Sequence, residues 1–150
     1  MADLPFQSSS SITHIGTATH EDHPDNLDDL GRRLLDDRRV LTTRDGAQKL
    51  VPRPGVKGLK PWETTTLRIG GRTFEVTGTP CQHLPEAECT RFILTTADIG
   101  TTGGLPNALY FSSDTVYLEE LAQIHKRFHV WIALLNLGGA AVSCPVARSR

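Results

Sequence analysis

Histidine and aspartate residues occur at places in the sequence where they could carry out chemistry. His20, His23 and Asp25 lie within one short polar run, His83 follows a candidate strand, and Asp114 follows another. Histidine and aspartate are common protein ligands of zinc, and the ligands of one catalytic site commonly come from several strand ends. A metal ion also lowers the pKa of a bound water, so these residue types favour metal-dependent hydrolysis.

Each of these residues also has an ordinary structural explanation. His20 and His23 could be surface histidines in a loop, with Asp25 as the N-cap of the helix that follows. His83 alone would be a loop residue, and Asp114 alone would be the N-cap of the next helical segment. The residues by themselves leave metal binding and these separate explanations open.

The composition narrows the classes of protein to which the chain can belong. Its 150 residues fit one domain with a sizeable core. The net charge of −1 argues against a general nucleic-acid surface, because phosphate binding depends on clustered lysine and arginine. Cys81, Cys89 and Cys144 are odd in number and lack CxxC spacing, so we predict three free thiols.

The sequence predicts a cytoplasmic protein with a single folded domain. The apolar stretch 130–142 is too short to span a bilayer, so we expect no membrane association, and residues 1–11 lack the pattern of a secretory signal. Residues 1–11 are predicted to form a flexible tail, 12–142 the domain, and 143–150 an irregular C-terminal tail. Oligomeric state is left open.

In the first half of the chain, short elements flank the polar run. Residues 12–19 read as a strand, and a helix is expected from Asp25 onward, because Leu27, Leu30, Leu34 and Leu35 form one apolar stripe. A strand at 40–42 and a helix at 44–50 should follow, and the proline-rich segment 52–62 reads as a loop.

In the second half, strands predominate. Alternating residues at 65–69 and 72–77 flank Gly70-Gly71, which is typical of a hairpin, and strands are expected at 90–95 and 108–113. Leu118, Leu121, Ile124 and Phe128 predict a helix, and the run 130–137 predicts a strand buried on both sides. This alternation predicts sheets covered by helices, with loops at strand ends that present the chemistry.

Four ordered segments resemble the metallo-β-lactamase-fold hydrolases, particularly the branch similar to sugar-lactone hydrolases. The segments are THEDHPDNLDDLGRRLL, TPCQHLP, YFSSDT and LLNLGGA. The superfamily has a first motif H-x-H-x-D-H, then a lone His, a bridging Asp and a final His. The resemblance implies an α/β fold, the αββα sandwich of that superfamily, with its metal site at one edge of the paired sheets.

The resemblance also implies roles for the five residues. His20, His23 and His83 would bind a first ion, and Asp25 and Asp114 a second; with one ion, Asp25 would orient the attacking water. The implied cofactor is one or two zinc ions, or manganese. The implied substrate is a small molecule with an ester, lactone or related bond.

The sequence departs from the family pattern at two places. Asn26 stands where the first motif has its last histidine, and no histidine follows the final motif. The strands that precede the first motif in the family are also missing or abbreviated, so the expected sandwich is incomplete and truncated at both ends. These departures favour, as an alternative, a truncated non-catalytic remnant or a metal-stabilised interaction module.

Overall fold

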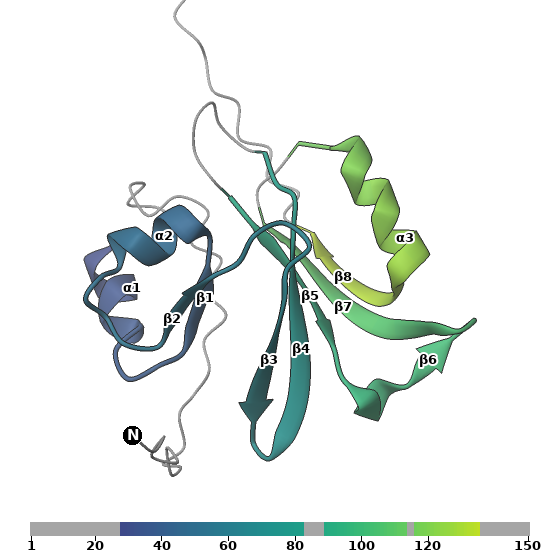
Figure 1. Ribbon diagram of the computed structural model, residues 1–150, viewed down its shortest axis with the longest axis horizontal. Coiled ribbons are helices and arrows are strands. Elements are labelled where there is room, and N and C mark those ends of the chain that lie inside the picture. The colour runs from purple at the N-terminus through teal and green to yellow at the C-terminus, as the bar shows by residue number, and fades with distance from the viewer. Residues whose placement is uncertain (1–27, 83–88, 114–115, 136–150) are drawn as a thin grey trace, which may run out of the picture.

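The computed structural model describes residues 28–82, 89–113 and 116–135 (Figure 1). In these residues the protein is a mixed α/β structure with a mostly antiparallel six-stranded sheet, a two-stranded parallel sheet and short helices. The two-stranded sheet with α1 and α2 lies on one side of the six-stranded sheet, and α3 lies on the other (Figure 1). The predicted α/β class is confirmed, and both predicted tails lie outside the described residues.

Helix α1 (Asp29–Leu34) begins at Asp28, whose carboxylate accepts a hydrogen bond from the Gly31 amide at 2.6 Å. The predicted helix is present, but its apolar stripe is largely open to solvent, because Leu30 and Leu34 are more than half exposed. A six-residue helix has fewer than two turns. Of the described leucines in this stripe, only Leu35, at the C-cap, reaches the local core.

The next elements build the two-stranded sheet. Strand β1 (Val40–Thr42) and helix α2 (Arg44–Lys49) confirm the predictions, and the Thr43 hydroxyl caps α2 by accepting from the Gly46 amide. Strand β2 (Val56–Gly58) pairs in parallel with β1 inside the segment predicted to be a loop. This strand depends on pairing with β1, which no local sequence pattern indicates.

The six-stranded sheet has the order β3-β4-β5-β7-β6, and β8 pairs with the other side of β7. The predicted hairpin is confirmed, because Gly70 and Gly71 join its strands with φ of 57° and 79°, as a tight hairpin turn requires. The loop after β5 also contains a 3₁₀ turn, Ala97–Ile99. The strands are β3 (Thr64–Ile69), β4 (Arg72–Thr79), β5 (Arg91–Thr95), β6 (Thr101–Thr102), β7 (Leu105–Ser113) and β8 (His129–Leu135).

Strand β5 lies between apolar clusters on the two faces of the sheet. Phe92 packs with Leu41 of β1 and with Leu59, the residue that follows β2. On the opposite face Ile93 packs with Ile124 at the start of α3 (Ile124–Arg127). A 3₁₀ turn, Glu119–Gln123, precedes α3, so the predicted helix is shorter and less regular than expected, although its apolar face does pack on the sheet.

Strand β8 is present as predicted, but the prediction that it is buried on both sides is wrong. Trp131, Ile132 and Leu134 are each more than half exposed. Among the described strands only β7 pairs with β8, and little of the described chain covers its faces. No helix in the described part of the chain is both long and apolar enough to cross a bilayer.

Candidate functional site

Three strands end at the same edge of the six-stranded sheet. Strands β4 and β7 both run antiparallel to β5, so they run parallel to each other, and β8 is parallel to β7. The register pairs Thr79 with Arg91, and Ser113 with Leu135. We call this edge, where β4, β7 and β8 end and β5 begins, the C-terminal edge.

The five residues predicted to form the site, His20, His23, Asp25, His83 and Asp114, lie outside the described residues. In the sequence, His83 comes four positions after the last residue of β4, and Asp114 directly follows the last residue of β7. The chain therefore leaves β4 and β7, in the direction of both residues, at the C-terminal edge. The described residues alone contain no group of three or more histidine, cysteine or acidic side chains placed to hold a metal ion.

A backbone hydrogen bond joins the segments that follow β4 and β7. The amide of Val116 donates to the carbonyl oxygen of Gln82 at 3.0 Å. Gln82 is the residue before His83, and Val116 is two residues after Asp114. This hydrogen bond therefore directly links residues that are close in sequence to two predicted metal ligands.

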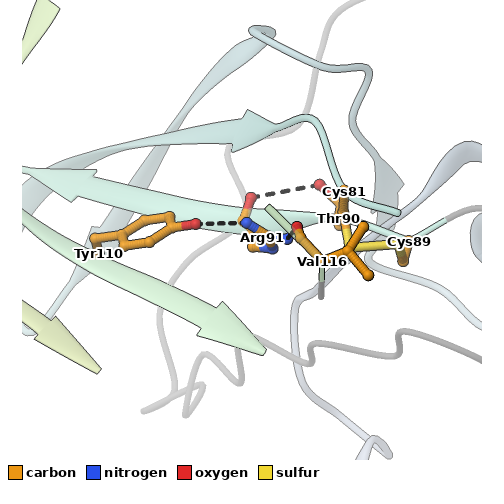
Figure 2. The surroundings of a disulfide bond; sticks show 6 residues. All are labelled: Cys81, Cys89, Thr90, Arg91, Tyr110 and Val116. Atoms are coloured by element: carbon orange, nitrogen blue, oxygen red, sulfur yellow. Dashed lines mark hydrogen bonds between the residues drawn. A yellow bond between two sulfur atoms is a disulfide. The ribbon is translucent and has the colours of Figure 1, made fainter. Parts of the chain in front are cut away.

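A disulfide between Cys81 and Cys89 lies at the same edge (Figure 2). Their Cα atoms are 5.3 Å apart, within the usual range for disulfides. The prediction of free thiols is therefore wrong for these two residues; Cys144 lies outside the described residues. The register explains the pairing, because each cysteine is two residues beyond the Thr79–Arg91 pair, so they continue the β4–β5 ladder as opposite residues.

Arg91 is a buried cation that sequence reasoning missed. Its side chain is 0% exposed; Nη1 donates to the Tyr110 hydroxyl at 2.7 Å and Nη2 to the Val116 carbonyl oxygen at 3.5 Å (Figure 2). Its Nε has no hydrogen-bond partner among the described residues. Arg91 thus holds the segment after β7 against the sheet. An arginine at the start of the apolar run RFIL was the available signal.

A hollow of about 500 Å³ opens at the C-terminal edge, on the face of the six-stranded sheet that is turned toward the two-stranded sheet. One wall comes from residues that follow β1 and β2, including Thr43 and Leu59. The other wall comes from the end of β4 and the start of β5, including Pro80 and both disulfide cysteines. The hollow therefore lies between the two sheets, beside the segment that leads to His83.

The comparisons with protein-family models and with curated proteins identify no relative of this chain. No protein-family model matches the chain, and no curated protein matches it. The site must therefore be interpreted from the residues of this chain.

Proposed function

We propose that the protein is a metal-dependent hydrolase of the metallo-β-lactamase type that acts on an ester, lactone or related bond. The observation that carries the proposal is the common edge at which β4, β7 and β8 end. In the sequence, His83, Asp114 and the motif NLGG follow the ends of these three strands. Catalytic ligands commonly come from several strand ends gathered in this way.

The donor set fits a zinc-type ion. His20, His23 and His83 would hold the first ion, and Asp25 and Asp114 would hold a second. Such an ion supplies Lewis acidity and lowers the pKa of a bound water. Asp25 would position that water, or accept its proton, as the catalytic carboxylate. The Gln82–Val116 hydrogen bond supports this assignment, because it joins the flanks of two of the ligands.

The layering of the described elements supports an αββα sandwich. The two-stranded sheet packs on one face of the six-stranded sheet through Leu41, Leu59 and Phe92. Helix α3 covers part of the opposite face. A helix, two sheets and a helix in succession form the layers of the proposed fold, with the hollow at the shared edge of the two sheets.

Metal content and turnover test this proposal. Protein purified without added metal should carry one or two zinc or manganese ions per chain, measured by elemental analysis. The variant His83→Ala should lose at least about tenfold in metal affinity, because one of three imidazoles is removed from the ion. The exposed His125 on α3 provides a matched control, so His125→Ala should keep the wild-type metal content.

Activity on neutral lactone, ester and thioester substrates completes the test. Turnover should depend on added zinc or manganese and should be lost in His83→Ala and Asp25→Ala. Equal metal content in wild type and His83→Ala would contradict the proposal.

A second candidate is a non-catalytic module stabilised by the metal. Asn26 favours it, because Asn26 takes the place of a histidine in the family motif and is a weaker ligand. In that case the protein would bind metal and its Tm would fall when a chelator removes it, without turnover on any substrate tested.

A further inference from the structure

The hollow between the two sheets carries two positive charges. Arg44 and Lys60 line it, and no aspartate or glutamate is among its described lining residues. The adjoining hollow shares Arg44, Lys60 and Pro61 with it, so both cations stand where the two hollows meet.

The two cationic side chains are available to a ligand. Both residues are exposed, and neither forms an ion pair within the described part of the chain. Glu63, the acidic residue of the adjoining hollow, contacts groups other than the two cationic side chains. Its Oε2 accepts from the backbone amide of Lys60 at 3.0 Å, and its Oε1 lies 4.0 Å from Nζ of Lys57.

The backbone that carries these cations is held in place by close packing. A Cβ at Gly58 would come within 2.7 Å of the Arg44 Cα, so β2 and the start of α2 are in direct backbone contact. On the other side, Glu63 N donates to Lys60 O at 3.0 Å, and Trp62 N donates to Gly78 O at 2.7 Å. The backbone of both residues is therefore fixed, so only their side chains lose freedom when they bind a ligand.

We propose that Arg44 and Lys60 bind an oxyanion, a carboxylate or phosphate group, carried by the substrate. A guanidinium pairs with either group through two parallel hydrogen bonds, and an ammonium adds a point charge. The hollow has the volume of an ordinary small-molecule site. Cys81 in its wall is two residues before His83 in the sequence, so an anion held here binds beside the segment that leads to a proposed metal ligand. In this respect the inference rests on the proposed function.

Anion binding is tested first on chelator-treated protein, so that it does not depend on metal or turnover. Trp62 lines the adjoining hollow and is one of two tryptophans in the chain, so Trp131→Phe leaves it as the only tryptophan reporter. In that background, inorganic phosphate and acetate are titrated separately against tryptophan fluorescence at constant ionic strength. At least one should give a saturable change, and the stronger of the two identifies the anion class.

The variants Arg44→Gln and Lys60→Gln should each weaken that binding by about tenfold, as expected for loss of one charge-assisted contact. Arg44→Lys should restore part of the affinity. Arg72→Gln removes the same charge from the distant β3–β4 hairpin and should leave the affinity unchanged. Thermal unfolding should give a similar Tm for every variant, since Arg44 and Lys60 are exposed.

A kinetic comparison then connects the anion to the substrate. With a pair of esters that differ only in a carboxylate, the Arg44→Gln/Lys60→Gln double variant should raise KM for the charged ester alone, with kcat little changed. Absence of saturable binding of either anion, or equal weakening by Arg72→Gln, would overturn the inference. Either result would leave the metal and His83→Ala measurements standing. Anion binding without metal or turnover would overturn the proposed function instead.

Discussion

The two ends of the six-stranded sheet are stabilised in different ways. At the hairpin end, Gly70 and Gly71 close β3 onto β4 with a local turn, and the nearby ion pair of Arg72 and Asp98 is exposed to solvent. At the C-terminal edge, Arg91 is fully buried and Cys81 is bonded to Cys89. A local turn closes the hairpin end, whereas a covalent bond and a buried, hydrogen-bonded cation hold the C-terminal edge.

The difference indicates which end of the sheet is suited to hold a functional site. Burying a cation or a polar backbone group is unfavourable unless it finds a partner. The hollow, the disulfide and the Gln82–Val116 hydrogen bond all lie at the edge that accepts this cost. At the hairpin end the polar groups stay in contact with solvent, so they carry little desolvation cost, and the turn closes the sheet.

The largest expected effect at the C-terminal edge comes from the disulfide. The double variant Cys81→Ser/Cys89→Ser should lower the free energy of unfolding by about 2–3 kcal/mol, the loop-closure value for a loop of this length. Urea unfolding of the oxidised wild type and the double variant measures this difference. Reduction of the wild type with a dithiol should reproduce the loss.

Thiol counting checks the same bond independently. Of three cysteines, two are paired, so unreduced wild-type protein denatured in urea should titrate one thiol per chain (3 − 2 = 1). The variant Cys144→Ser should titrate none. Three thiols in the protein unfolded without reductant would remove the covalent link from the comparison between the two ends.

A smaller effect is expected from the hydrogen bond to the buried guanidinium. The change Tyr110→Phe removes the oxygen that accepts from Arg91 Nη1 and leaves a buried charged N–H unsatisfied. The free energy of unfolding should fall by about 1–3 kcal/mol. The exposed Tyr117 supplies the matched control, and Tyr117→Phe should change the value by less than about 0.5 kcal/mol. Equal effects in both variants would mean that the Arg91 contact does not stabilise the edge.

The sequence predicted the elements that depend on local patterns. The hairpin around Gly70 and Gly71, strand β1 and helix α2 follow from residues a few positions apart, and the structure confirms them. It did not predict the pairing of Cys81 with Cys89 or the burial of Arg91, because both depend on the register between β4, β5 and β7. Strand β2 was missed for the same reason, since its partner β1 is distant in sequence.

The same distinction between local patterns and strand pairing applies to the candidate site. The residue types and their order in the sequence were sufficient to nominate His83 and Asp114. That their segments leave the sheet at one edge depends on β4 and β7 being parallel with β5 between them. The cations Arg44 and Lys60 gave no sequence signal, because each is an isolated charge until β1, β2 and β4 bring their flanks together.

The smallest effect is expected at the hairpin end. Arg72 Nε lies 3.5 Å from Asp98 Oδ2, but the two side chains are 70% and 53% exposed, so water and salt screen the pair. Arg72→Gln, Asp98→Asn and the double variant should form a cycle with a coupling energy of about 0–1 kcal/mol, reduced further in 1 M salt. Chemical denaturation in urea at low and high salt measures it. A coupling as large as the Tyr110→Phe effect would show that the hairpin end also depends on a specific polar link, and the contrast between the two ends would then fail.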